Sequence, residues 1–161
     1  MIKGKWILGS EDITDAIAVR NAVFNEELQL SADFSAQDAL SMHAVIYDDD
    51  TPAASARLLF HGDELVIDAL CVKKEHRGRL IGDLLIRLTI LKALDFTDTV
   101  YAHTLAEAQP FFEKYGFAEA GEAAVISGVN APLMRATQQQ ITAACVFESC
   151  KGCSGCKGGN A

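Results

Sequence analysis

The pattern of hydrophobic and polar positions predicts alternating strands and helices up to residue 136. Short apolar runs bounded by turn residues are typical of strands. We expect strands at residues 5–8, 42–47, 53–60, 64–72, 99–104, 123–127 and 132–136. Apolar residues at helical spacing predict helices over 11–30, with Ser10 as N-cap, and over 106–115, where Gly116 is a natural stop. Residues 32–41 fit a short helix or a loop.

The segment EHRGRLIGDLLIRL (75–88) starts with cationic residues and continues into a leucine-rich helix that we expect to end near Leu94. Its apolar stripe is predicted to contain Leu80, Leu84, Leu88 and Leu91, with Ile81 and Leu85 alongside. The three strands before this helix follow one another through short turns, which predicts an antiparallel meander, whereas helices connect the later strands. We therefore expect an α+β fold with a mixed, mostly antiparallel central sheet flanked by helices.

Composition and charge narrow the class of protein. The chain has 161 residues and 50% of them are hydrophobic, which is enough for one packed domain. The net charge of −8 argues against a nucleic-acid partner and favours a cationic one. The N-terminus lacks the apolar run of a signal peptide, and no segment is apolar over the length that a bilayer requires. We expect a cytoplasmic protein with no membrane partner.

The loop before the leucine-rich helix has residues suited to phosphate binding. A helix N-terminus presents unpaired N–H groups and the positive end of the helix dipole. Gly78 and Gly82 let the backbone approach an anion, and Arg77 and Arg79 add positive charge. The same residues also fit a structural turn before a core helix, and short glycine patterns do not separate the two interpretations.

Two segments around this loop resemble the GNAT superfamily of N-acetyltransferases. CVKKEHRGRLIGDLL (71–85) is similar to the family's acyl-coenzyme A loop, which usually reads Arg-Gly-x-Gly-x-Gly or Arg-Gly-x-Gly-x-Ala before a leucine-rich helix. Leu80 stands where the middle glycine is expected. AEAQPFFEKYGF (106–117) looks like a later helix of the same family, which often ends in Phe-Tyr-Glu-Lys-x-Gly-Phe.

A third segment extends the resemblance toward the N-terminus. VRNAVFNEE (19–27), followed by Asp38, His43 and Arg57, is similar to the N-terminal half of a bacterial GNAT branch. The three segments occur in the family's order, and the resemblance covers about residues 3–136.

The resemblance implies transfer of an acetyl group from acetyl-coenzyme A (acetyl-CoA) to a primary amine on a small molecule or peptide. Strand 64–72 would splay from strand 99–104 and pair its backbone with the pantetheine arm, and the loop would hold the pyrophosphate. The acceptor would enter from the opposite side, near residues 11–30 and 31–41. A homodimer would also fit, because dimers are common in folds like this one. The expected cofactor contacts are Leu70, Cys71, Val72, Arg77, Gly78, Arg79, Leu80, Ile81 and Gly82.

The general acid is where the sequence departs most from the family pattern. Many GNAT enzymes use the tyrosine of Phe-Tyr-Glu-Lys, and here that position is Phe112, which has no proton to donate. Tyr115 is a candidate acid one turn further on, although its position favours a packing role. The reaction could also proceed without a dedicated acid, because a thiolate is a fairly good leaving group.

The candidate bases are Asp68 and Glu27. Strand alternation puts Asp68 on the same face as Leu70. There it would either face the reaction cleft or pair with an arginine such as Arg57. Glu27 ends the resembling helix near the expected acceptor entrance, where a solvated helix face is the alternative. His103 lies near the end of the splayed strand and could face the acyl group, but the sequence does not favour it as a base over Asp68 and Glu27.

The end of the chain, 137–161, is predicted to be a tail separate from the 1–136 domain. Its cysteines are Cys145, Cys150, Cys153 and Cys156. Four thiolates can form a tetrahedral zinc site, and the C-x2-C-x2-C spacing is also part of an iron–sulfur ligand run. A redox role and a mobile tail with exposed thiols stay open. A second hypothesis for the whole chain is therefore a catalytically weak coenzyme A-binding regulatory module, with this tail as its metal-binding or redox output.

Overall fold

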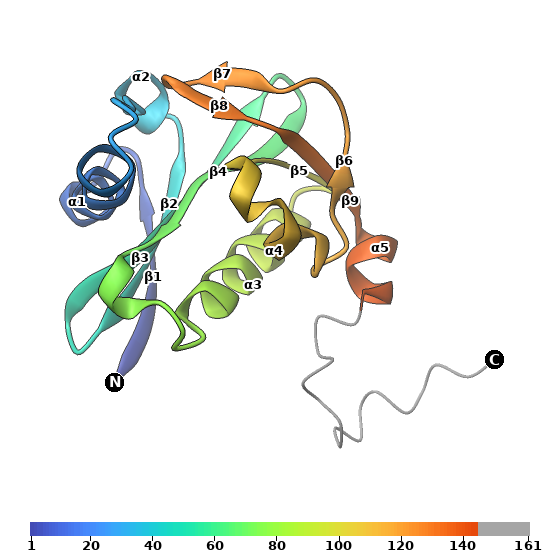
Figure 1. Cartoon of the computed structure of the whole chain (residues 1–161). Helices are drawn as coiled ribbons and strands as arrows, with labels where there is room; N and C mark the ends of the chain where they lie inside the picture. Colours follow the sequence, from blue (N-terminus) through green and yellow to red (C-terminus); the bar gives the residue numbers. More distant parts are fainter. Residues whose placement is uncertain (145–161) are drawn as a thin grey trace.

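The computed structural model describes residues 1–144 as an α+β fold built around one seven-stranded sheet (Figure 1). The strands are β1 (Ile2–Leu8), β2 (Met42–Asp48), β3 (Thr51–His61), β4 (Glu64–Val72), β5 (Thr99–His103), β6 (Ala118–Glu119), β7 (Ala124–Ile126), β8 (Val129–Ala131) and β9 (Leu133–Thr137). The α-helices are α1 (Thr14–Arg20), α2 (Ser35–Asp38), α3 (Ile81–Leu94), α4 (Gln109–Glu113) and α5 (Gln138–Ala143). Shorter or non-α turns are η1 (Asn21–Glu27), η2 (Lys74–His76) and η3 (Ala106–Ala108).

The main sheet has the strand order β1-β2-β3-β4-β5-β9-β6, and β7 and β8 form a separate hairpin. Within it, β4 and β5 pair in parallel and the other neighbours pair antiparallel. The parallel pair arises because α3 carries the chain back across one face of the sheet before β5 begins. The predicted meander and the predicted fold class, a mixed and mostly antiparallel sheet flanked by helices, are both confirmed.

Helices cover both faces of the sheet (Figure 1). On one face, Ile86 of α3 belongs to the same buried cluster as Leu58 of β3, and this cluster also takes in α4 and α5. On the other face, Val19 of α1 and Phe24 of η1 share a cluster with Cys71 of β4. The sheet therefore separates an α3 side from an α1 side. No helix within residues 1–144 is long and apolar enough to cross a lipid bilayer.

The predicted apolar stripe of α3 is wrong for three of its leucines, whereas Ile81 and Leu85, which were predicted alongside them, are buried. Leu80, Leu84 and Leu91 are 75%, 40% and 64% exposed. The buried residues of the helix are Ile81, Leu85, Ile86, Thr89, Ile90 and Ala93. Apolar residues occupy almost every side of α3, so helical spacing alone could not select the face that meets the sheet.

The predicted helix over 11–30 is α1 followed by η1, which is a π-helix. It begins at Thr14, whose N–H donates to the Asp12 carboxylate at 3.0 Å. The predicted N-cap Ser10 is therefore wrong, because the aspartate two residues later supplies the oxygen that the first helical turn needs.

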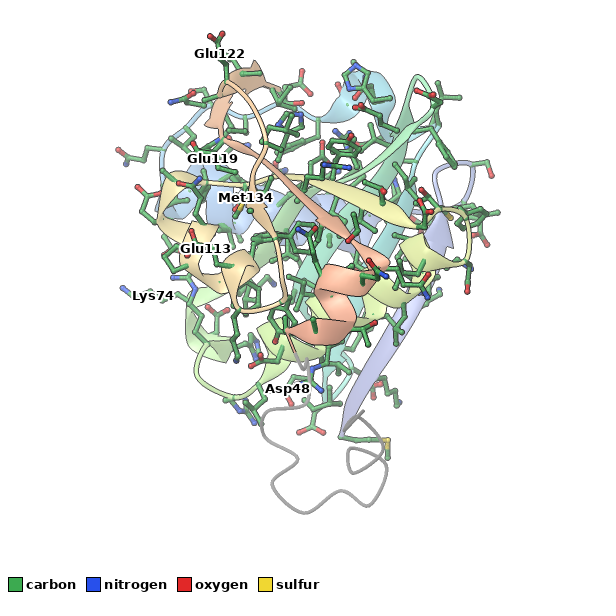
Figure 2. The ribbon with its side chains drawn as sticks, turned by 90° about the vertical axis from the view of Figure 1, so that its right-hand side faces the viewer. Asp48, Lys74, Glu113, Glu119, Glu122 and Met134 are labelled. Atoms are coloured by element: carbon green, nitrogen blue, oxygen red, sulfur yellow. The ribbon has the colours of Figure 1, made fainter. Side chains whose placement is uncertain are left out.

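At the other end, α5 packs against the core. Thr137 caps α5 through a capping box with Gln140, and Ile141 is buried. Gly116 has a φ of +93°, and a Cβ there would lie 2.5 Å from the Gln140 carbonyl oxygen, so this close approach requires glycine. Beside it, Glu119 of β6 pairs with Met134 of β9, and Figure 2 labels both. The division at residue 136 stays a prediction, because 145–161 lie outside the described residues.

Candidate active site

β4 and β5 diverge at the centre of the sheet. Only Leu65 to Ile67 pair with β5, and from Asp68 onward β4 has no strand partner on that side within residues 1–144. On its other side, β4 bulges at Ala69, which has a left-handed φ of +50°, so that Arg57 pairs with Asp68 but Ser55 pairs with Cys71. The divergence leaves backbone groups of β4 available to a ligand.

The bulge also reverses the side-chain order that simple alternation predicts. Asp68 faces the α1 side, where it meets Arg57. Leu70 packs with the clusters on the α3 side. The predicted placement of Asp68 and Leu70 on one face is therefore wrong, because an extra residue in the strand shifts every later side chain.

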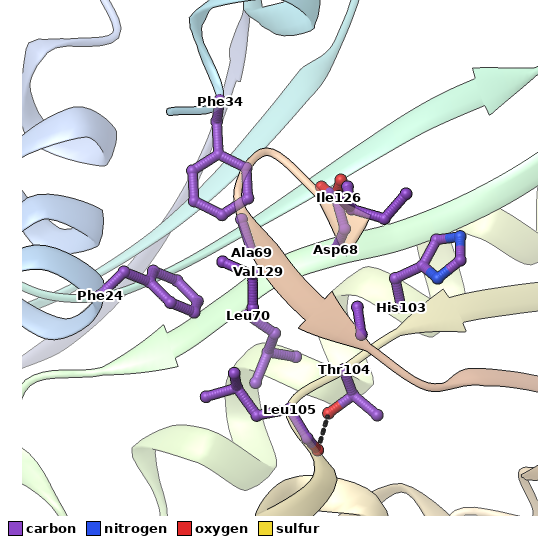
Figure 3. A pocket seen from close by; sticks show the side chains of 11 residues that line it. Phe24, Phe34, Asp68, Ala69, Leu70, His103, Thr104, Leu105, Ile126 and Val129 are labelled. Atoms are coloured by element: carbon purple, nitrogen blue, oxygen red, sulfur yellow. Dashed lines mark hydrogen bonds between the residues drawn. The ribbon is translucent and has the colours of Figure 1, made fainter. Parts of the chain in front are cut away.

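Two adjoining cavities lie on the α1 side of this divergence. The inner one reaches Leu70, Thr104 and Leu105, and Figure 3 shows Asp68 and His103 toward its right and Phe24 toward its left. The outer one has a volume of about 270 Å³. The two cavities share Phe34, Asp68, His103 and Ile126. The inner cavity has a volume of about 20 Å³, which holds little more than one water molecule, so the space for a ligand lies in the outer cavity.

A chain of buried ion pairs builds one wall of these cavities. Arg57 donates from Nε and Nη2 to the two Asp68 oxygens at 2.8 and 2.7 Å. Arg20 donates through both terminal nitrogens to Asp38, each at 2.7 Å. Arg57 Nη1 links the two pairs, because it donates to Asp38 at 3.2 Å and to the Phe34 carbonyl at 2.8 Å. Both guanidinium groups also lie 5.2 Å from the centroid of the Phe34 ring.

The charges in this network stabilise one another. Burial raises the pKa of Asp38, but the hydrogen bonds from Arg20 and the charges of Arg20 and Arg57 outweigh it and hold that pKa below its usual value. The sequence left two roles open for Asp68, a base in the cleft or a structural partner of Arg57. Both of its carboxylate oxygens accept hydrogen bonds from the Arg57 guanidinium, which fits the structural role. A base role for Asp68 would have to operate alongside that pairing.

His103 is better placed for proton transfer than the sequence suggested. It stands at the end of β5 and lines both cavities beside Asp68. Burial lowers its pKa, so the ring is neutral near pH 7. Its Nδ1 atom is buried and has no hydrogen-bond partner within residues 1–144. Because Nδ1 is buried, a proton from a ligand in the cavity would have to reach the other ring nitrogen, Nε2, of this neutral imidazole.

On the other side of the splayed strand, the loop into α3 forms an anion cradle. The backbone N–H groups from Gly78 to Asp83 donate no hydrogen bond within the described residues. Gly78 and Leu80 have φ values of +74° and +62°, which turn the loop toward the helix N-terminus. An adjoining cavity of about 240 Å³ is lined by Val72, Gly78, Gly82 and Phe111, among others. A run of unpaired N–H groups at a helix N-terminus is a binding site for phosphate.

The side chain of Leu80 is 75% exposed and is one of those that line this cavity, so it borders the cradle. A left-handed conformation is unfavourable for a leucine, by about 1–2 kcal/mol relative to glycine. The loop therefore keeps the backbone shape that a glycine would supply, at some cost in strain.

The two arginines of the loop are ion-paired. Arg77 donates from Nη1 and Nη2 to the Glu27 carboxylate, each at 2.7 Å, and from Nε to the Val72 carbonyl at 3.0 Å. Arg79 pairs with Asp48 at the end of β2, which Figure 2 labels. The structure thus brings Glu27, a predicted base, to Arg77, a predicted phosphate ligand. The Arg77 hydrogen bonds lower the pKa of Glu27, which weakens it as a base.

Tyr115 lies apart from the acceptor-side cavities. Its ring is fully buried on the α3 side, and its hydroxyl donates to Asp83. Burial and that hydrogen bond raise its pKa to about 12. Phe112 is also buried in this cluster, with its ring 5.5 Å from that of Phe117. The helix that supplies the family's acid therefore supplies packing here.

The structure describes Cys71 but not the four cysteines of the predicted tail. Cys71 is buried, and burial raises its pKa to about 12, so its side chain is an inert core group. The predicted metal ligands Cys145, Cys150, Cys153 and Cys156 lie outside the described residues. Within residues 1–144, no group of histidine, cysteine, aspartate and glutamate side chains could hold a metal ion.

Sequence reasoning missed Phe34 and undervalued His103. Phe34 joins the wall only through contacts with arginines that come from α1 and β3. No spacing in the sequence relates those three positions. For His103 the available signal was its place at the end of the strand that splays from β4, where a side chain reaches the cleft.

Comparisons with known proteins agree with this geometry. A family model described as an acetyltransferase (GNAT) domain matches residues 39–119. A Bacillus subtilis protein named as a candidate acetyltransferase is 28% identical over 139 residues, covering 81% of this chain and 92% of its own length.

Solved structures show the same fold. A candidate N-acetyltransferase from Lactobacillus plantarum superposes with a TM-score of 0.72 at 27% identity, covering 85% of this chain and 98% of that one. Escherichia coli ElaA superposes with a TM-score of 0.74 at 24% identity, covering 84% of this chain and 99% of that one. The latter likeness concerns the fold alone.

Proposed function

Because the chain belongs to the GNAT acetyltransferase family, we propose that it transfers the acetyl group of acetyl-CoA to a primary amine. The observation that carries this proposal is the run of unpaired N–H groups from Gly78 to Asp83, next to the open edge of β4. One feature suits a pyrophosphate and the other suits the amide groups of a pantetheine arm. Together they match the two ends of one ligand.

The cofactor contacts follow from these features. Backbone groups of Leu70, Cys71 and Val72 would pair with the pantetheine arm. The loop from Arg77 to Gly82 would hold the pyrophosphate, mainly through its N–H groups, because both arginines already have carboxylate partners. Arg77 would contribute charge if it exchanged Glu27 for phosphate.

On the acceptor side we assign proton acceptance to His103. A primary ammonium has a pKa near 10.4, so a proton must leave before the nitrogen can attack. The amine nitrogen then bonds to the thioester carbonyl carbon and the carbon–sulfur bond breaks. His103, directly or through water, takes the proton that the ammonium loses before attack, and the second proton, which the nitrogen loses after the new bond forms, passes to the departing thiolate or to water. Asp68 and its arginine partner hold the cavity wall beside this histidine.

No tyrosine is assigned as general acid. Phe112 has no proton, and the Tyr115 hydroxyl is engaged by Asp83 with a pKa raised to about 12. A thiol has an ordinary pKa near 8.5, so the thiolate can depart without protonation at a cost that the enzyme can tolerate.

A panel of amines incubated with acetyl-CoA tests the activity, with the acetylated product followed by mass. Thiol-release assays are unsuitable because the chain has five cysteines. We expect at least one acetylated amine. Binding of acetyl-CoA without any product over a broad panel would contradict transferase activity and favour a binding module.

The role of His103 has its own readout. His103→Gln should lower kcat about 10²-fold, within the range for loss of a general base, and leave the KM for acetyl-CoA unchanged. Because the base must be neutral and burial lowers its pKa from 6.5, the wild-type enzyme should lose activity only below about pH 6.5. That acidic limb should disappear in the variant. An unchanged pH profile would remove His103 from the mechanism.

A further inference from the structure

We infer that the acceptor is a primary amine with an apolar body, a second positive charge and no carboxylate, held in the outer cavity. This inference rests on the proposed function and adds the substrate class. The cavity has a volume of about 270 Å³, which suits a small molecule.

The cavity has well-defined walls. Leu59 and Val66 line it from β3 and β4, and the segment around Phe34 faces them. The β7–β8 hairpin closes a further side with Ile126, and a backbone hydrogen bond of 2.9 Å from Asp33 N–H to the Ser127 carbonyl joins this hairpin to the Phe34 segment. The apolar side chains can cover a hydrocarbon chain or ring.

The charges that line the cavity are negative. Among the residues that the structure describes, its formally charged side chains are those of Asp33 and Asp68, and none that lines it is a lysine or arginine. Asp68 is neutralised by its two hydrogen bonds from Arg57. The remaining titratable groups that line it are His61 and His103.

Asp33 therefore carries the unbalanced charge. It is exposed at the rim, and one of its oxygens accepts from the Ser35 N–H at 2.9 Å. The hydrogen bonds from Ser35 lower its pKa, so it is ionised at neutral pH. A rim carboxylate favours a ligand with a cationic group beyond the reacting amine.

The charges around the outer cavity also disfavour acceptors that carry a carboxylate. Two guanidinium groups lie behind the wall, and both are already paired: Arg57 donates from Nε, Nη1 and Nη2 to Asp68, Phe34 and Asp38, and Arg20 donates from both terminal nitrogens to Asp38. An acceptor carboxylate in this cavity would lose water without gaining a cationic partner, which is costly. Free amino acids are accordingly expected to be poor acceptors.

Three amines test this inference, two of which differ from the first by a single group. These are 1,5-diaminopentane, L-lysine, which adds a carboxylate, and 1-aminopentane, which lacks the second amine. We expect kcat/KM, followed by product mass, to be about 10²-fold lower for L-lysine, because its carboxylate stays unpaired. For 1-aminopentane we expect a reduction of about two- to fivefold, in keeping with an exposed ion pair.

Two variants with the same loss of charge locate the effect. Asp33→Asn should abolish the preference for 1,5-diaminopentane over 1-aminopentane. Asp63→Asn, an exposed residue of the β3–β4 turn outside the cavity lining, should keep it. L-lysine equal to 1,5-diaminopentane, or a preference unchanged in Asp33→Asn, would overturn the inference.

The inference and the proposed function fail differently. Acetylation of other amines with none of the three, in the same acetyl-CoA assay, would overturn the substrate class and support the transferase. Acetylation of no amine at all would remove both.

Discussion

Arginine–carboxylate pairs serve two different regions of this protein. In the acceptor wall, Arg57 and Asp68 have side chains 1% and 4% exposed. Beside the phosphate cradle, Arg77 and Glu27 have side chains 44% and 27% exposed, although their hydrogen bonds are equally short. Both contacts are arginine–carboxylate ion pairs, and the difference in burial determines whether each pair is structural or can be replaced by a ligand.

Burial makes the first pair a structural element and leaves the second replaceable. Removing one partner of a buried pair strands a charge away from water, whereas an exposed pair contributes little because water and salt compete with it. The acceptor wall can therefore hold Phe34 and His103 in place, and the cradle can release Arg77 to a phosphate. The comparison predicts a large stability effect at the wall and a binding effect at the cradle.

The largest expected effect is on the wall. Asp38→Asn removes a charge that binds both Arg20 and Arg57, so we expect the free energy of unfolding to fall by about 3–5 kcal/mol. Urea or guanidinium unfolding followed by circular dichroism measures it. A loss below 1 kcal/mol would show that burial does not distinguish the two regions.

An intermediate effect should come from the cradle backbone. Gly78→Ala places a Cβ in open space but at a φ of +74°, so the cost is backbone strain of about 1–2 kcal/mol. Relief of that strain moves the N–H groups of the loop, so acetyl-CoA binding should weaken about tenfold.

Gly62→Ala is the matched control, because Gly62 has a φ of +65° and equally open space in the β3–β4 turn. Both variants should lose similar stability in unfolding experiments, and only Gly78→Ala should lose affinity in titration calorimetry. Equal affinities in the two variants would remove the cradle from cofactor binding.

The smallest effect is expected at the exposed pair. Glu27→Gln should change the free energy of unfolding by about 0–1 kcal/mol and tighten acetyl-CoA binding a fewfold, because Arg77 no longer has a competing carboxylate. Weaker binding in this variant would mean that Glu27 supports the cofactor side rather than competing with it.

The pH dependence of this pair has a defined sign. The folded-state pKa of Glu27 is lowered, so its stabilisation is present above its unfolded pKa, near 4.3, and disappears as pH falls through the lower folded value. The stability difference between wild type and Glu27→Gln should therefore vanish in acid and stay constant near neutrality. A difference that grew below pH 4 would contradict the pairing.

Local patterns carried most of the fold. Strands, turns and the loop between β4 and α3 each depend on residues close together in the sequence, so local patterns predict them. β4, for example, was predicted with its observed ends. The buried face of α3 was not, because both of its sides are apolar.

The site depends on contacts that no local pattern specifies. The left-handed Ala69 is set by the pairing of β3 with β4, and it decides which face Leu70 and the later side chains of β4 meet. The wall joins Arg20, Asp38 and Arg57, which come from three separate elements. Tertiary packing thus converted a candidate base into a partner of Arg57 and brought His103 into the cleft.

Titration calorimetry of the full chain with acetyl-CoA tests the central claim most directly. The free N–H groups of the cradle and the open edge of β4 predict saturable binding at one site per chain, with a dissociation constant below about 1 mM. No heat of binding at millimolar acetyl-CoA would contradict the claim that this loop and strand form a cofactor site.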